Sequence, residues 1–135
     1  MPAKKQAAPV PDTVIRHIAD ELSGNEDVIA LILFGSVARG QSRRISDIDL
    51  CIVSRPDLPE PEKMELLSYG SRNIDVSLFF DLPLQIRFRV IKEGRTLFCT
   101  DPLRLHRIIT GTVREYLDFN TFISKYRFRA ASLKV

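Results

Sequence analysis

The stretch LFGSVARGQSRRISDIDLCIV, residues 33–53, holds the end of one strand and the whole of the next, and the rest of the fold is built around it. The apolar run over residues 28–34 leads into this stretch. Because such a run is apolar on both faces, it predicts a central strand that is covered on both sides. Gly35 and Ser36 end that strand and open a turn, and residues 41–45 form a polar, basic loop. Residues 47–53 alternate between the two faces of a second strand.

The second strand carries two aspartates, Asp47 and Asp49, which are two positions apart and therefore share one face. They would lie about 6.6 Å apart along the strand, where two carboxylates resist ionising together without a cation. Aspartate oxygens suit Mg²⁺, which also binds substrate phosphates. Gly35 and Ser36 precede a short helix start, whose free N–H groups favour an anion. Two alternatives involve no ligand. The aspartates can be the solvent-exposed residues of an alternating strand, and Gly35-Ser36 can be a plain strand-to-helix turn capped by Ser36.

The spacing of these residues resembles a known signature. Gly35-Ser36, ten intervening residues, and then Asp47-Ile48-Asp49 resembles the DNA polymerase β-like nucleotidyltransferase superfamily. The fuller pattern, Gly-Ser-Val-Ala-Arg-Gly followed by Ser-Asp-Ile-Asp-Leu, is similar to the minimal nucleotidyltransferases (MNT), which are commonly paired with HEPN-domain proteins in toxin–antitoxin systems. The resemblance is strongest over residues 31–53 and compatible out to about residue 100.

The resemblance implies a site for ATP and Mg²⁺. It implies three carboxylates as metal ligands and catalytic groups, namely Asp47, Asp49 and Asp75, the last of which helps to deprotonate an attacking hydroxyl. The predicted nucleotide-binding residues are Gly35, Ser36, Arg39 and Ser46. An exposed strand aspartate is the alternative reading of Asp75. Arg43 and Arg44 are interpreted as solvated surface charge.

The remaining pattern predicts an α/β (α+β) nucleotidyltransferase fold, with a small mixed sheet flanked by helices. Residues 1–11 have no hydrophobic periodicity and are predicted to be a disordered N-terminal arm. A single nucleotidyltransferase domain is predicted over residues 12–135. Within the second predicted helix, Met64 and Leu67 are expected to face inward. The last helix is predicted to start at Asp101-Pro102, with Asn120 as a candidate break. The other predicted elements are helices over 12–22, 62–69 and 81–93, and strands over 73–80 and 96–100.

Charge and composition narrow the function classes. Residues 101–135 hold seven Lys/Arg and three Asp/Glu, so the basic excess lies in the C-terminal quarter, whereas residues 1–100 hold thirteen and fourteen. This excess suits an acidic partner, although a solvated helix face explains it equally well. The two cysteines show no zinc-binding spacing, and the longest apolar run is too short to span a bilayer. We therefore expect a cytoplasmic protein that binds no membrane.

The expected reaction is nucleotidyl transfer, in which AMP passes from ATP to a hydroxyl and pyrophosphate leaves. The chain has no room for a second domain to grip the acceptor, and the resemblance implies a HEPN toxin that is adenylylated on a tyrosine, with this protein as antitoxin. Nucleic acid is not expected as a ligand, because the aromatic C-terminal end lacks the alternation of a stacking platform. Two alternatives stay open: an antitoxin of the same fold that acts by binding alone, and a small-molecule nucleotidyltransferase that acts as a homodimer.

Overall fold

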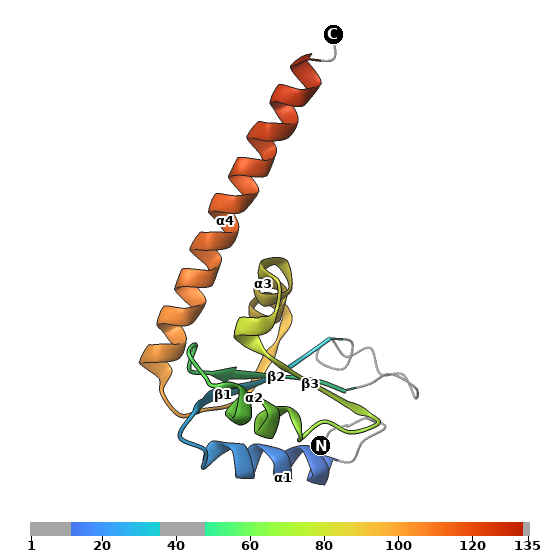
Figure 1. Cartoon of the computed structure of the whole chain (residues 1–135), viewed down its shortest axis with the longest axis vertical. Coiled ribbons are helices and arrows are strands. Elements are labelled where there is room, and N and C mark those ends of the chain that lie inside the picture. Colours follow the sequence, from blue (N-terminus) through green and yellow to red (C-terminus); the bar gives the residue numbers. More distant parts are fainter. Residues whose placement is uncertain (1–11, 36–47, 134–135) are drawn as a thin grey trace, which may run out of the picture.

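The computed structural model describes residues 12–35 and 48–133. Its core is one four-stranded sheet with the strand order β3-β2-β1-β4 (Figure 1). The strands are β1 (Val28–Phe34), β2 (Ile48–Ser54), β3 (Ile74–Leu78) and β4 (Arg95–Cys99). β1 pairs antiparallel with β2 and β4, whereas β2 and β3 run parallel. This mixed sheet confirms the predicted fold class.

The helices form a layer on each face of the sheet. They are α1 (Asp12–Ser23), α2 (Glu60–Leu67), α3 (Leu84–Glu93) and α4 (Pro102–Leu133), with a short 3₁₀ turn, η1 (Phe79–Asp81), after β3. α1 and α2 cover one face, where Leu22 and Leu66 pack against Leu31, Leu50 and other strand residues. α3 and the first turns of α4 cover the other face (Figure 1). β1 is therefore buried on both faces, as its apolar run predicts.

Three details of the sequence-based reading are wrong. Leu66 fills the core, whereas Met64 and Leu67 are 64% and 38% exposed. Neighbouring helical residues are about 100° apart, so Leu67 turns away once Leu66 faces the core, and Met64 lies on the opposite side. β3 ends at Leu78 instead of continuing to residue 80, because the chain turns through η1 toward α3. Finally, α4 continues through Asn120 without a break, and Asp101 caps its start by accepting a hydrogen bond from the N–H of Arg104 (3.1 Å).

Candidate active site

The candidate site lies at the sheet edge where β1 ends and where β2 and β3 begin. Gly35 follows the last residue of β1 and has a φ of 84°, in the left-handed region that glycine adopts without strain. A Cβ atom built on Gly35 would lie 3.2 Å from Cγ of Asp49 and still closer to one of its carboxylate oxygens. Residue 35 must therefore be glycine for the chain to turn here while the Asp49 carboxylate packs directly against the backbone.

Asp49 is held by pairing on both sides of β2. It lies opposite Phe34 of β1 and opposite Asp75 of β3. The side chain is half-buried, so its position is set by the strands that flank it. Phe34, also half-buried, packs on the same side of the sheet as Cys51 and is the apolar neighbour of Asp49. The sequence gives no signal for Phe34, because its position opposite Asp49 depends on a strand register that the local pattern does not specify.

Asp75 is the second residue of β3, in parallel register with Asp49. Adjacent strands lie about 4.8 Å apart, so the two carboxylates start from neighbouring points on one face. Asp75 is exposed, whereas Asp49 is half-buried. The structure therefore brings together two of the three predicted carboxylates, one fixed against the backbone and one open to solvent.

A tight turn fixes the register that pairs these aspartates. Ser71 and Ile74 exchange two backbone hydrogen bonds (2.9 and 3.3 Å) across the turn before β3. The N–H of Ile48, the first residue of β2, donates to the carbonyl of Asn73 (2.9 Å). The starts of β2 and β3 are thus tied together one residue before Asp49 and two before Asp75.

The other predicted site residues lie outside the described residues. They are Ser36, Arg39, Ser46 and Asp47, together with the loop arginines Arg43 and Arg44. Among the described residues there is no group of three metal-ligating side chains. The two described carboxylates nevertheless fit a divalent cation, because they are hard oxygen ligands whose mutual repulsion a cation would relieve.

Cys51 shares the carboxylate face of β2 but takes no part in such chemistry. It is fully buried, and this burial raises the pKa of its thiol to about 12, although a hydrogen bond with Ser77 opposes the rise. A thiol with this pKa stays protonated near neutral pH and is not a nucleophile there. The candidate site is therefore a carboxylate site.

Comparison with known proteins places this geometry in a family. The family model described as "Polymerase beta, Nucleotidyltransferase" matches residues 16–103. The chain belongs to this nucleotidyltransferase family. A Methanocaldococcus jannaschii protein named "Putative protein adenylyltransferase MJ1547" is 28% identical over 108 residues, which are 80% of this chain and 85% of that protein. The resemblance inferred from Gly35-Ser36 and the aspartate pair is thereby confirmed.

Solved structures show the same fold. One is a chain of a toxin–antitoxin crystal structure with AMP-PNP, with a TM-score of 0.65 and 19% identity, over 83% of this chain and 91% of that one. Another is a chain of the tri-AMPylated Shewanella oneidensis HEPN toxin in complex with MNT antitoxin, with a TM-score of 0.59 and 17% identity, over 82% and 87% of the two chains. In the part of the chain that the structure describes, no helix is both long and apolar enough to cross a membrane.

Proposed function

We propose that this nucleotidyltransferase moves AMP from ATP to a hydroxyl group of a HEPN toxin, most simply a tyrosine, and thereby acts as its antitoxin. The observation that carries the proposal is the pairing of Asp49 and Asp75 in register beside the Gly35 turn. Family membership supports the transfer chemistry, and the name of the M. jannaschii relative supports a protein acceptor. We treat residues 12–135 as one nucleotidyltransferase domain, because helices at both ends of this range pack on the same sheet.

The two described aspartates suit different tasks. Asp49 is half-buried against Gly35, so it is a fixed ligand whose position does not depend on the substrate. Asp75 is exposed, so a hydroxyl that arrives from solvent can reach it and donate a hydrogen bond. Asp47, Asp49 and Asp75 would hold Mg²⁺, which when bound neutralises phosphate charge and stabilises the attacking and leaving oxygens.

The proposed step balances as a single displacement. The acceptor oxygen forms a bond to the α-phosphorus of ATP, the bond from that phosphorus to the bridging oxygen of the β-phosphate breaks, and pyrophosphate leaves. Asp75 accepts the proton of the acceptor hydroxyl. The backbone at Gly35, with Ser36, Arg39 and Ser46, would bind the phosphates and hold the leaving group in line. Positioning and charge neutralisation then supply most of the rate enhancement.

The partner is proposed from the solved complexes. The fold matches a chain of a complex between HEPN toxin and MNT antitoxin in which the toxin is tri-AMPylated, and a chain of a toxin–antitoxin structure that contains AMP-PNP. The first description supports a HEPN protein as acceptor, and the second supports an adenosine nucleotide as donor. The basic C-terminal quarter of this chain is compatible with an acidic acceptor surface.

The test uses the purified protein, Mg²⁺, and a candidate HEPN-domain protein from the same genome. ATP labelled at the α-phosphate should transfer its label to the HEPN protein, whereas ATP labelled at the γ-phosphate should not. Intact mass should rise by one AMP per transfer, and peptide mapping should place the AMP on a tyrosine. Chelation of Mg²⁺ should abolish the transfer.

Three variants complete the design. Asp49→Asn and Asp75→Asn should each abolish or strongly reduce label transfer. The matched control is Glu26→Gln, which also removes one carboxylate but at an exposed position on the loop between α1 and β1, and it should transfer at the rate of the unmodified protein. A HEPN protein that gains no AMP, yet is neutralised equally well by the Asp49→Asn, Asp75→Asn double variant, would support the binding-only antitoxin. AMP on a small alcohol instead would support the small-molecule enzyme.

A further inference from the structure

α4 carries a regular apolar seam along most of its length. Positions spaced alternately four and three residues apart form this seam, and they are Leu105, Ile109, Thr112, Tyr116, Phe119, Ile123 and Tyr126. A 4-3 spacing is the heptad repeat by which helices pair side by side. The seam therefore predicts that α4 has a helical or sheet partner along its whole length.

The first half of the seam has its partner inside the chain. Leu105 and Thr112 are buried, and the ring of Tyr116 stacks on that of Phe88 in α3, with centroids 3.9 Å apart and planes 6° apart. Beside this stack, Glu115 forms a long ion pair with Arg87 of α3 (3.7 Å). These contacts fix the first half of α4 against α3.

The second half of the seam has no partner among the described residues. Phe119 and Tyr126 of the seam are 41% and 65% exposed, and Phe122, which lies beside the seam three residues after Phe119 and four before Tyr126, is 63% exposed. Figure 1 shows why: α4 runs past the end of α3 and extends beyond the rest of the structure. We call residues 117–127 of α4 the arm. Its exposed aromatic side chains form the kind of contiguous apolar patch that marks an interaction surface.

The charges within the arm are arranged by sign. Asp118 lies at its N-terminal end, and Lys125 and Arg127 lie toward its C-terminal end. A second arm laid antiparallel would bring the acidic end of each copy to the basic end of the other, whereas a parallel one would bring like charges together. The midpoint between Asp118 and Lys125 falls within one position of residue 122. A two-fold axis at Phe122 therefore places Asp118 of each copy near Lys125 of the other.

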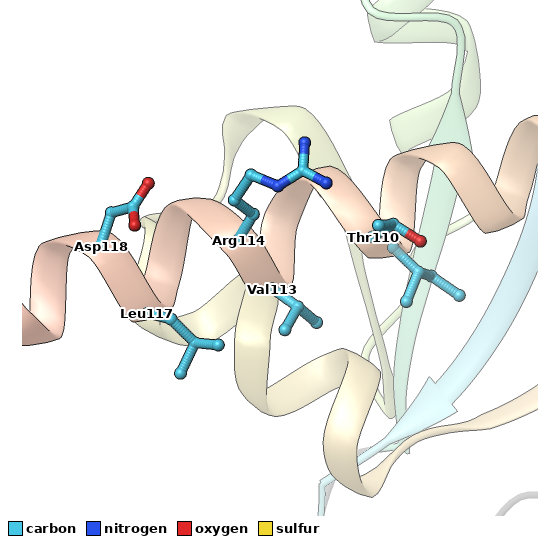
Figure 2. Close-up of a pocket in the computed structure, with 6 residues that line it drawn as sticks. Thr110, Val113, Arg114, Leu117 and Asp118 are labelled. Carbon is cyan, nitrogen blue, oxygen red and sulfur yellow. The ribbon is translucent and has the colours of Figure 1, made fainter.

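An open hollow lies next to the arm on the same helix. It has a volume of about 410 Å³ and is lined by the described residues Ile109, Thr110, Val113, Arg114, Leu117 and Asp118. Figure 2 shows Val113 and Leu117 on one side of the helix, with Arg114 and Asp118 along the other. At about 100° per residue, Val113 and Leu117 lie on the side of the helix away from Phe122. The hollow is therefore separate from the surface that carries Phe122.

We propose that the arm binds the arm of a second copy of this chain, as an antiparallel helix pair with Phe122 at the two-fold axis. The interface is isologous, so the same residues serve both copies. Residue 122 lies twenty positions after the start of α4, about 30 Å along the helix, so the two sheets sit about 60 Å apart at opposite ends of the pair. The homodimer thus keeps both sites open, and its formation does not depend on the proposed transfer activity.

The first test measures mass in solution by light scattering across a series of micromolar concentrations. The unmodified protein should shift from monomer to dimer, and Phe122→Glu should raise the dissociation constant at least tenfold or give monomer throughout. Leu103→Glu is the matched control, because Leu103 is also on α4 and 60% exposed but lies outside the arm. It should dimerise like the unmodified protein. A monomer at every concentration, or equal loss in both variants, would overturn the proposal.

The second test uses cysteine cross-linking in a Cys99→Ser background, since Cys51 is buried and protonated. Phe122→Cys should form a disulfide with itself on mild oxidation, because only residues at the two-fold axis approach their own copies. Tyr126→Cys, equally exposed, should not, since its two copies would lie about 12 Å apart along the helix axis, too far for a disulfide. Equal cross-linking at both positions would indicate a parallel pair. If the protein stays monomeric by itself and Phe122→Glu abolishes its binding to the HEPN protein, the arm is a surface for that protein. Either this result or equal cross-linking at the two positions would refute the antiparallel homodimer.

Discussion

The carboxylate of Asp49 occupies the space that a side chain on Gly35 would need. Gly35 follows β1 and Asp49 belongs to β2, so the contact links the turn that would bind phosphate to the strand that would bind the metal. A change at either residue should therefore affect both halves of the site.

Gly35→Ala should lower the free energy of unfolding by about 1–3 kcal/mol, because alanine at a φ of 84° is strained and its Cβ displaces Asp49. Urea denaturation measures this. Gly111→Ala is the control: Gly111 lies inside α4 with nothing within 4 Å of an added Cβ, so alanine should stabilise by about 0.5–1 kcal/mol. A neutral Gly35→Ala with an intact site would contradict the packing described.

Asp75→Asn should slow transfer at saturating ATP by about 100-fold or more while ATP affinity changes little, because a general base acts mainly in the transition state. Single-turnover kinetics and calorimetry separate the two quantities. Loss of ATP affinity with an unchanged rate at saturation would make Asp75 a metal ligand only.

Stability should fall in alkaline solution through Cys51. Its folded-state pKa is about 12, above the value of about 8.5 for an exposed thiol. The contribution of the buried neutral thiol is therefore complete below about pH 8.5 and is lost as the pH rises toward 12. Urea denaturation of Cys51→Ala at several pH values should give a shallower loss over this range than the unmodified protein. Tyr69, whose pKa is raised chiefly by its hydrogen bond to Glu21, contributes equally in both proteins. Parallel curves would contradict this prediction.

Phe88→Ala should lower the free energy of unfolding by about 2 kcal/mol, because it removes the stack on Tyr116 that fixes α4 against α3. Phe122→Ala removes the same side chain from an exposed position, so in dilute solution its effect should stay within about 0.5 kcal/mol. Equal losses in the two variants would mean that the stack does not anchor the helix.

The sequence predicted the strands well because their hydrophobic patterns are local. Asp49 and Asp75 were expected to serve one site, and the structure places them in register on neighbouring strands. The part played by Phe34 could not be predicted, since it follows from the register of β1 against β2. Met64 and Leu67 were misassigned for a related reason: a helix of eight residues contains too few turns for its apolar stripe to identify the buried face.

The helix that follows β4 shows the same limit. Asn120 is a poor helix former, yet α4 passes through it, because one residue with low propensity costs less than breaking a long helix. The roles of Asp47, Ser36, Arg39 and Ser46 remain predictions. Their assignment depends on the family pattern, and they lie outside the described residues.

The sheet order also sets the timing of folding during synthesis. β1 lies between β2 and β4, but β4 ends only at residue 99 of 135. Until the ribosome has released β4, a nascent chain exposes one unpaired edge of β1, and the part of the sheet face that Leu105 covers stays open until α4 emerges. Unpaired edges and bare apolar faces attract chaperones and proteases. A chain truncated before residue 95 should therefore be degraded rather than accumulate as a partly active fragment.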